Sequence, residues 1–349
     1  MRTAALTIAC VVALTFSLAA AAQPAAETPG PVQWAPEAKA SVIVPSNDIN
    51  LDAWAAYRNR QATPSVDQHL TDPILIGAID LHAHFGPDTY ARQWDAFEIA
   101  RHSDEAGMRA VVFKNHWSES AGLAYLVNRY AGLHHLQAFG GLALNTPEGG
   151  INPEAVRYFA EVEGHYARIV WMPTHDSEHE VRALHETRPY VRVSDNGVLL
   201  PQVLQVLDLI KHYDLTLATG HVSPEEMLQI VSAAHDRGIT RIILTHPGLG
   251  PVFTDPTLDQ LRQAVAMGGY AEVVASELLG ADKDKFVAMI RALGPQHVFV
   301  STDSGLVGTH NHADALVLSI RTLRAAGFSE GDLDLMFRRN PAFLIGLPN

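Results

Sequence analysis

Two histidines at a spacing of two residues are the first group in this chain that could do chemistry. His82 and His84 lie in the stretch Ile79-Asp80-Leu81-His82-Ala83-His84, where they follow an apolar run. Side chains two residues apart in an extended segment point to the same side, so both imidazoles can bind one cation. The pair alone is a weak signal, because a chain with 18 histidines should contain about one such pair by chance. A second pair is present in His310-Asn311-His312.

Three more candidate ligands stand elsewhere in the chain, and each ends an apolar run. They are His221 after Ala218-Thr219-Gly220, His246 after Leu244-Thr245, and Asp303 after Val300-Ser301-Thr302. In a barrel of parallel strands the carboxyl ends converge on one mouth, which brings residues far apart in sequence within reach of one ion. Imidazole and carboxylate are ordinary zinc ligands. The positions therefore favour a metal site over a set of unrelated strand-end and loop histidines.

A repeating pattern from Ile74 onward supplies the elements that would position these side chains. Short apolar runs alternate with amphipathic stretches, which is typical of βα units and a parallel sheet. We expect strands at 74–81, 110–114, 137–144, 167–173, 215–220, 241–245, 270–275 and 297–302, with helices that include 91–106, 153–163, 201–213, 224–236, 258–267, 282–293 and 313–326. Eight strands over about 275 residues predict a (β/α)8 TIM barrel. A doubly wound open sheet is the alternative, because periodicity does not show closure.

The order of these residues resembles that of the amidohydrolase superfamily, in which a His-x-His pair follows the first strand, single histidines follow the fifth and sixth, and an aspartate follows the eighth. The stretch 339–347, Arg-Asn-Pro-Ala-Phe-Leu-Ile-Gly-Leu, is similar to a helix that often closes those proteins. The resemblance implies one or two divalent metal ions, zinc by default, although manganese, iron or nickel suits the same donors. It also implies that Asp303 is both a ligand and the base that takes a proton from the metal-bound water. The implied ligands are His82, His84, His221, His246 and Asp303.

Lys114 marks a departure from the binuclear members of that superfamily, which carry a carboxylated lysine at the end of the fourth strand. No lysine lies near Trp171-Met172-Pro173-Thr174, but Lys114-Asn115-His116 ends the second expected strand and indicates an atypical subgroup. Lys114 is either carboxylated and bridges two metals, or remains an ammonium group that anchors an anionic substrate. A third interpretation is a barrel lysine that pairs with Asp80 or Asp303.

Four further residues are expected to form the wall of a substrate pocket: Arg92, His116, Trp117 and His175. His175 opens the stretch 175–200, which is longer than an ordinary connection and is expected to cover the mouth of the barrel. A merely solvated loop is the alternative. His175-Asp176-Ser177-Glu178-His179 lacks the glutamate directly after the first histidine that a zincin motif requires.

A metal-activated water would be available near neutral pH for hydrolysis of an amide, cyclic amide, lactone or ester bond. The alternatives are a mononuclear metal lyase, such as a decarboxylase, or a deaminase on the same barrel. A different class is a catalytically idle exported barrel that binds a metal or a small molecule. Asp303 favours an enzyme, because a binding protein needs no carboxylate beside a water site.

The composition of the whole chain limits its partners. With 47% apolar and 18% charged residues, the 349-residue chain can bury a large core. Its net charge of −13 and the absence of a Lys/Arg run argue against nucleic acid and anionic membranes as partners. We expect a small-molecule substrate and no stable membrane insertion, and a homo-oligomer is left open.

The N-terminal region predicts export. Residues 1–22 contain Arg2, an apolar run and Ala20-Ala21-Ala22 before Gln23, the pattern of a cleavable signal peptide, so we expect a periplasmic or secreted protein. Cleavage near Ala22 removes Cys10, the one cysteine, and leaves only nitrogen and oxygen ligands for a metal. Residues 23–72, rich in Pro and Ala with a short helix expected around 50–60, are interpreted as an N-terminal extension, and 73–349 as the barrel.

Overall fold

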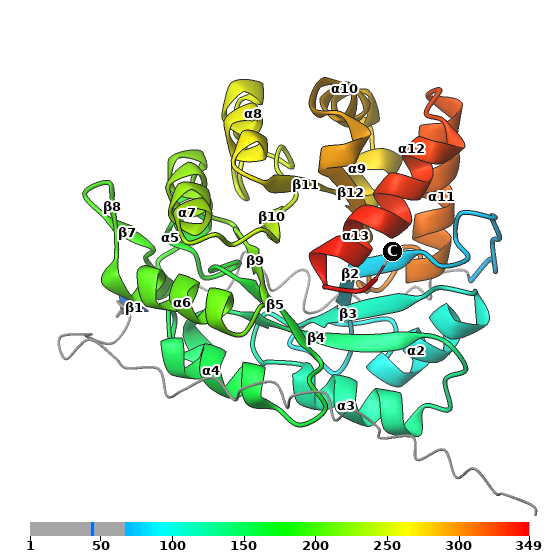
Figure 1. Ribbon diagram of the computed structural model, residues 1–349, viewed down its shortest axis with the longest axis horizontal. Helices are drawn as coiled ribbons and strands as arrows, with labels where there is room; N and C mark the ends of the chain where they lie inside the picture. Colours follow the sequence, from blue (N-terminus) through cyan, green and yellow to red (C-terminus); the bar gives the residue numbers. More distant parts are fainter. Residues whose placement is uncertain (1–42, 45–66, 349) are drawn as a thin grey trace, which may run out of the picture. The chain divides into compact units, whose positions relative to one another are not determined.

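The computed structural model describes residues 43–44 and 67–348 (Figure 1). By its internal contacts the chain divides into residues 1–35 and 36–349, and all described residues belong to the second unit. The expected signal peptide and the helix expected around 50–60 lie outside the described residues. Among the residues described, no helix is both long and apolar enough to span a bilayer.

Eight parallel strands form the central sheet (Figure 1). Along the chain they are β2 (Ile79–His84), β3 (Ala110–Lys114), β4 (Gln137–Ala143), β5 (Ala167–Trp171), β9 (Thr216–Ala218), β10 (Ile242–Leu244), β11 (Gly269–Val274) and β12 (Val298–Ser301). Each strand pairs in parallel with the next. The segment after β12 returns to β2, where the amide of His84 donates to the carbonyl of Ser304 over 3.0 Å and the amide of Asp303 donates to that of His82 over 2.9 Å. The predicted (β/α)8 barrel is therefore confirmed.

The first strand begins later than the sequence pattern predicts. Residues 73–77 form a turn in which Ile74 and Leu75 are buried, and Gly77 adopts a φ of 82°. The apolar character of this stretch therefore reflects packing beneath the turn, not an extended conformation. As a result His82 and His84 lie within β2 and do not follow it.

Helices connect the strands. The seven expected helices are present as α2 (Ala96–Glu105), α4 (Pro153–Glu161), α6 (Pro201–His212), α7 (Pro224–Asp236), α8 (Leu258–Ala266), α10 (Lys283–Leu293) and α11 (His312–Ala325). Helix α2 begins five residues after the expected start, because Asp95 accepts from the amide of Glu98 over 2.8 Å while the Glu98 carboxylate accepts from the amide of Asp95 over 2.9 Å. This reciprocal capping box fixes the helix start.

The closing helix expected within 339–347 is present as α13 (Asn340–Leu344). Helices that the pattern did not identify complete the fold: α3 (Ala121–Tyr130), α5 (Glu178–Ala183), α9 (Ala275–Leu279) and α12 (Glu330–Asp334), with short turns η1 (Thr146–Glu148) and η2 (Pro295–His297) and a π-type turn η3 (Leu335–Arg339). The long connection 175–200 is folded. It contains α5, the strand β6 (Tyr190–Val191), which pairs antiparallel with β1 (Ile43–Val44), and the hairpin of β7 (Ser194–Asp195) and β8 (Val198–Leu199).

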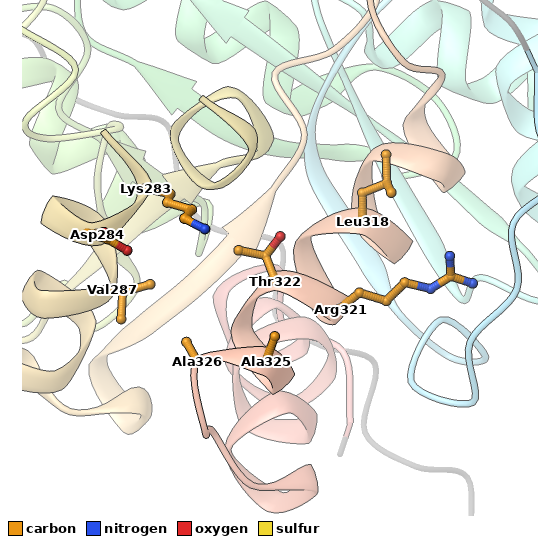
Figure 2. A pocket seen from close by; sticks show the side chains of 8 residues that line it. All are labelled: Lys283, Asp284, Val287, Leu318, Arg321, Thr322, Ala325 and Ala326. Carbon is orange, nitrogen blue, oxygen red and sulfur yellow. The ribbon is translucent and has the colours of Figure 1, made fainter. Parts of the chain in front are cut away.

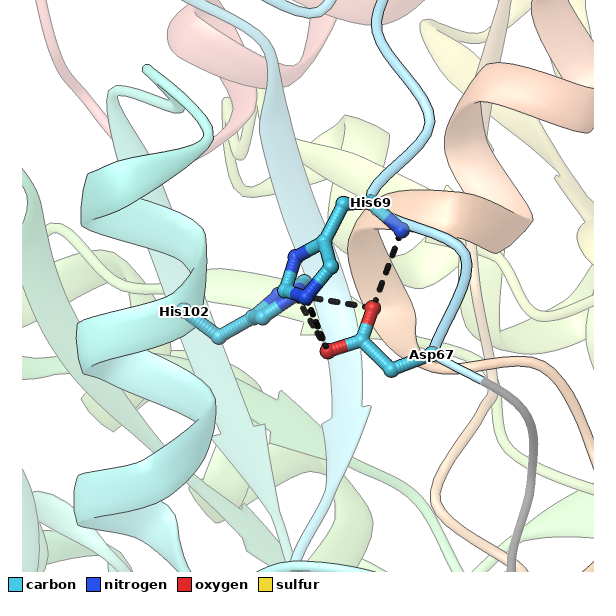
Figure 3. Close-up of side chains that lie close together, drawn as sticks. All are labelled: Asp67, His69 and His102. Atoms are coloured by element: carbon cyan, nitrogen blue, oxygen red, sulfur yellow. Dashed lines mark hydrogen bonds and ion pairs between the residues drawn. The ribbon is translucent and has the colours of Figure 1, made fainter.

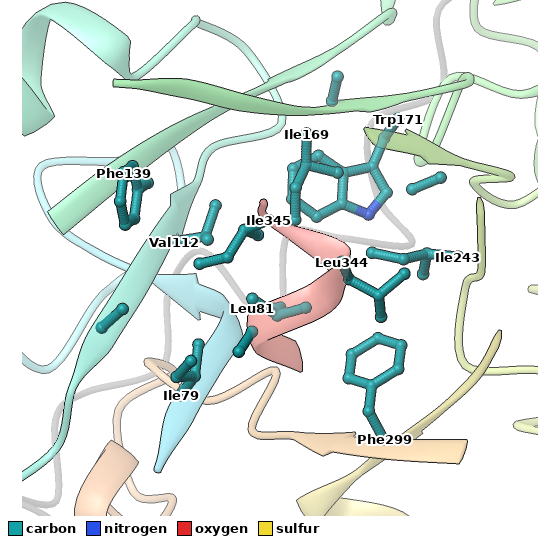
Figure 4. Packing of buried hydrophobic residues seen from close by; sticks show 14 residues of the cluster. Ile79, Leu81, Val112, Phe139, Ile169, Trp171, Ile243, Phe299, Leu344 and Ile345 are labelled. Carbon is teal, nitrogen blue, oxygen red and sulfur yellow. The ribbon is translucent and has the colours of Figure 1, made fainter. Parts of the chain in front are cut away.

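The barrel interior is apolar at the end opposite the candidate ligands (Figure 4). Side chains of the strands meet those of the C-terminal helix α13, and the labelled members of this core are Ile79, Leu81, Val112, Phe139, Ile169, Trp171, Ile243, Phe299, Leu344 and Ile345. The side-chain amide of Asn340 anchors α13 by donating to the carbonyls of Val298 (2.6 Å) and Pro295 (2.9 Å). This helix fills the amino ends of the strands, so the carboxyl ends remain available for a site.

Candidate metal centre

A cavity of about 300 Å³ lies at the carboxyl ends of the barrel strands. Eight of the ten predicted site residues line it: His84, Arg92, Lys114, His116, His175, His221, His246 and Asp303. His82 lies beneath them, fully buried, with its Nε2 atom 3.0 Å from Asp303 Oδ1. Trp117 stands behind the wall, where its indole stacks against His175 at a centroid distance of 6.1 Å and its Nε1 donates to Thr89 Oγ1 over 2.6 Å.

The first cluster of ligands joins β2 to the end of β12. The Nε2 atoms of His82 and His84 both lie 3.0 Å from the same oxygen of Asp303. On its other side, His82 places Nδ1 2.9 Å from Glu272 Oε1 of β11. The pKa of Glu272 is about 2, because His82 outweighs the effect of burial, so this carboxylate can only accept a hydrogen bond. Nδ1 of His82 therefore donates to Glu272, while Nε2 faces Asp303.

The charges of this cluster follow from its contacts. Burial would raise the pKa of Asp303, but His82 and His84 hold it well below its usual range. Burial and the nearby Arg92 guanidinium hold the pKa of His84 well below its usual range. Burial would also lower the pKa of His82, but Asp303 and Glu272 raise it. Asp303 is therefore an ionised carboxylate between two imidazoles: the pKa of His82 is raised above its usual value and that of His84 is lowered.

A second cluster lies on the opposite side of the cavity around Glu180 of α5. Glu180 is fully buried, and its two oxygens lie 2.7 Å from His175 Nδ1 and 2.5 Å from His221 Nδ1. His221 Nε2 in turn lies 3.1 Å from His246 Nε2. Burial lowers the pKa of His221 to about 3 and that of His246 to about 4, so both rings are neutral near pH 7. With Nδ1–H donated to Glu180, His221 presents a lone pair at Nε2, which is the form that binds a cation.

The two clusters belong to one circle of six imidazoles. Successive ring centroids are 4.1 to 5.9 Å apart around the cavity, in the order His82, His84, His116, His175, His221, His246 and back to His82. His116 is anchored from behind, since its Nδ1 lies 3.0 Å from Thr174 Oγ1. His175 is buried, so the interpretation of its stretch as a solvated loop is wrong at this residue.

Lys114 is buried below the circle. Its Nζ lies 2.8 Å from His82 Nε2 and 5.2 Å from the centre of the Trp171 ring, and burial lowers its pKa to about 8. The interpretation in which Lys114 pairs with Asp80 is wrong. The Asp80 carboxylate accepts instead from the Thr302 hydroxyl (2.6 Å), the Thr302 amide (3.0 Å) and the His82 amide (3.1 Å).

Arg92 brings a second cationic group to the wall. Its guanidinium contacts Asp88 at 2.6 and 2.7 Å and lies 3.3 Å from His84 Nδ1. It also lies over the Tyr90 ring at 5.5 Å. Arg92 is therefore held in place by Asp88 at the edge of the cavity.

Unusual backbone conformations occur at the site. His246 and Asp303 have φ angles of +22° and +50°, a region that non-glycine residues seldom adopt and that is common at functional sites. Gly220, directly before His221, has a φ of +68°, and a Cβ atom there would lie 2.4 Å from the carbonyl oxygens of Met172 and Pro173. Only glycine fits this position, so Gly220 allows the chain to turn His221 into the cavity.

Two residues of the site were missed by sequence reasoning, Glu180 and Glu272. Glu272 is a carboxylate inside an apolar strand, where burial requires a partner, and this could have identified it. Glu180 follows Ser177 at the spacing of a helix cap, and Ser177 Oγ does accept from the Glu180 amide over 3.0 Å. That pattern predicts a helix start but gives no sign that the carboxylate turns toward two histidines.

Two other features lie outside this centre. A hollow of about 460 Å³ between α10 and α11 is bordered by residues that include Lys283, Asp284 and Arg321 (Figure 2). No histidine is among the residues that line it, so it offers no comparable donor set. A cluster of Asp67, His69 and His102 is a further group of donors (Figure 3).

Comparison with solved structures identifies the fold class as that of amidohydrolase-type barrels. An amidohydrolase from Pseudomonas aeruginosa superposes with a TM-score of 0.57 at 10% identity, over 78% of this chain and 98% of that one. An amidohydrolase from Burkholderia multivorans with bound HEPES gives 0.54 at 16% identity over 78% and 99%, and was also solved with bound zinc. The phosphotriesterase homology protein from Escherichia coli, complexed with phosphate in its active site, gives 0.54 at 17% identity over 78% and 99%. The predicted resemblance is confirmed at the level of the fold.

The chain belongs to the family described as "Family of unknown function (DUF6282)", whose family model matches residues 77–272. This stretch runs from just before β2 to Glu272 and includes His82, His84, His221 and His246. Among curated proteins, none matches this chain in sequence.

Proposed function

We propose that this protein is a divalent-metal-dependent hydrolase that cleaves an amide, cyclic amide, lactone or ester bond of a small molecule. The observation that carries this proposal is the meeting of two histidine–carboxylate clusters in one cavity at the carboxyl ends of the barrel strands. Active sites of such barrels lie at this end. The solved neighbours include one with bound zinc, which supports zinc as the first metal to test.

The donor set fits a divalent cation. Ligand atoms about 2.0–2.1 Å from a tetrahedral zinc are about 3.3–3.4 Å apart. The Nε2 atoms of His82 and His84 lie 3.0 Å from Asp303 Oδ1, and those of His221 and His246 lie 3.1 Å apart, so small movements suffice for coordination. Glu272 and Glu180 hold the Nδ1 atoms of His82 and His221, the outer contact that metal-binding histidines usually make.

Several residues that line the cavity have a role in the proposed reaction. A bound cation would polarise the scissile carbonyl and acidify water. Asp303, ionised and facing the cavity, accepts a proton from the attacking water and transfers it to the leaving group. Arg92 and Tyr90 at the cavity edge orient the substrate, and Phe253 on the wall excludes bulk water from the reacting bond.

Lys114 determines how many cations the centre holds. Burial lowers its pKa to about 8, so a larger fraction of this side chain than of an ordinary lysine is the neutral amine that reacts with carbon dioxide, and we propose that Lys114 is carboxylated and would bridge two ions. The competing proposal keeps an ammonium group that binds an anionic substrate beside a single ion. We retain export after cleavage near Ala22, with a small-molecule substrate, as part of this proposal.

The test is a substrate screen on protein that starts at Gln23 and has been loaded with zinc or manganese, beside an Asp303→Asn variant. The library contains amides, cyclic amides, lactones and esters, and mass spectrometry identifies the products. Addition of one water to the substrate by the wild-type protein, with at least a hundred-fold loss in Asp303→Asn, supports the proposal. Loss of carbon dioxide without addition of water identifies a lyase, and ligand binding without turnover identifies a binding barrel; each contradicts a hydrolase.

A further inference from the structure

Asp67, His69 and His102 form a cluster of donors that shares no residue with the barrel-mouth centre (Figure 3). Asp67 and His69 come from the segment that leads into the barrel, and His102 comes from α2. We propose that these three side chains bind a divalent transition-metal cation such as zinc, which fastens residues 67–72 to the barrel.

Three donor atoms of this cluster lie close to one another. Asp67 Oδ2 lies 3.2 Å from His102 Nε2 and 3.5 Å from His69 Nε2. These separations bracket the distance of about 3.3–3.4 Å between two ligands of a tetrahedral zinc ion. The two imidazole rings are 5.6 Å apart and approach the same carboxylate oxygen from different directions. His69 is 75% exposed, so water can reach a cation bound to this cluster.

Neighbouring N–H groups orient the Asp67 carboxylate. Oδ1 accepts hydrogen bonds from the His69 amide and the Asn311 side chain, each over 3.1 Å, and also lies 3.3 Å from His102 Nε2. Oδ2 lies near both imidazoles. A carboxylate held through one oxygen by N–H donors presents the other oxygen to a cation in a fixed direction.

Hydrogen bonds to α11 already hold the segment that carries Asp67 and His69. The amides of Gln68 and Leu70 donate to the two oxygens of the buried Asp314 carboxylate on α11, each over 2.7 Å. The Asp67 side chain lies between Asn311, the residue that caps α11, and His102 of α2. On α2, His102 is only 13% exposed and packs against Trp94 at a centroid distance of 4.8 Å. A cation would meet ligands that need little further ordering.

The competing interpretation is a plain ion pair between Asp67 and its two histidines, which gives similar distances. Metal counting separates the two. The protein from Gln23 onward is saturated with zinc sulfate and desalted, and bound zinc is measured by elemental analysis in four forms. These are wild type, Asp67→Asn, His102→Gln, and His135→Gln as a matched control. His135 also contacts an aspartate, Asp104, but His134 contacts the other oxygen of that carboxylate, and these atoms are not among the converging donor groups of the described residues.

We expect Asp67→Asn and His102→Gln each to bind one equivalent of zinc less than wild type, and His135→Gln to bind the wild-type amount. The same one-equivalent difference is expected in a His82→Ala/His84→Ala background, so the result does not depend on the proposed function of the barrel centre. Cobalt provides a second measurement, since a tetrahedral cobalt site gives visible absorption that the two variants should lose. Circular dichroism confirms folding of each variant. Equal zinc content in wild type, Asp67→Asn and His102→Gln overturns the proposal and leaves an ion pair.

Discussion

Replacement of Glu180 by glutamine tests how the centre orients its histidines. Glu180 accepts from Nδ1 of both His175 and His221, and it has no exposed surface. Glutamine keeps the shape but has one acceptor oxygen and one NH2 group. One of the two histidines must then face a donor, which forces its proton onto Nε2, the atom that faces the cavity. That ring can no longer bind a cation in this orientation.

The expected magnitude follows from the number of ligands affected. Loss of one outer contact to a metal-binding histidine lowers metal affinity by about 10- to 100-fold. Because glutamine still accepts from one of the two rings, we expect a loss within this range, at most about 100-fold, which corresponds to about 2.7 kcal/mol. The matched control is Glu178→Gln on the same helix, since the Glu178 carboxylate pairs with Arg182 and Arg192 on the outside of the fold.

Zinc affinity is measured by competition with a chromophoric chelator for wild type and both variants. We expect Glu178→Gln to stay within about two-fold of wild type, because exposed ion pairs contribute little. A Glu180→Gln variant that binds zinc as tightly as Glu178→Gln would refute the argument that this carboxylate fixes the tautomer of the ligands.

Three further predictions concern other parts of the molecule. Gly220→Ala places a methyl group 2.4 Å from two backbone carbonyl oxygens at a φ of +68° and should cost about 3 kcal/mol of stability. The control Gly238→Ala has a similar φ of +69° but only the flexible end of a lysine nearby, and should cost about 1 kcal/mol. Equal losses of stability in denaturant unfolding would contradict the steric reason. Lys114→Met should reduce bound metal from two equivalents to one if Lys114 bridges two ions, and an unchanged count in elemental analysis removes the bridge. Asp104 accepts from three backbone amides, and although burial would raise its pKa, these bonds hold the pKa well below its usual range. Its contribution is therefore fully present above a pH of about 4 and lost as the pH falls further, so Asp104→Asn should cost about 2 kcal/mol at pH 7 and progressively less in unfolding experiments at lower pH; a gap that does not shrink would contradict the assignment.

The barrel was predictable because its strands are apolar and regularly spaced, and the candidate ligands were predictable because they lie at or near the carboxyl ends of those strands. The ends of individual strands were harder to predict. Ile74 and Leu75, for example, are apolar because they pack in a turn before the first barrel strand. Helix α3 escaped the pattern because its buried face consists of the small residues Ala121, Ala124 and Val127, while the larger Leu126 and Tyr130 are exposed. Its apolar residues therefore lie on both faces and blur the helical period.

The carboxylates that orient the histidines could not be deduced from sequence spacing. Glu272 contacts His82 across 190 positions of the chain, and Glu180 reaches His221 across 41. A carboxylate on a strand or helix could contact any of several histidines, and only the folded barrel determines which histidine lies next to it. Trp117 was predicted as a pocket wall, but it is not among the residues that line the cavity. Its place after β3 determines which residues lie near it, but not the direction in which its ring points.

The most direct test of a metal centre at the barrel mouth is a count of bound metal in protein purified from Gln23 onward without chelators. The measurement is made by elemental analysis beside a His82→Ala/His84→Ala variant. The account predicts bound divalent metal in the wild-type protein and a loss of at least one equivalent in the variant. No difference in metal content between the two proteins, even after reconstitution with zinc or manganese, would contradict it.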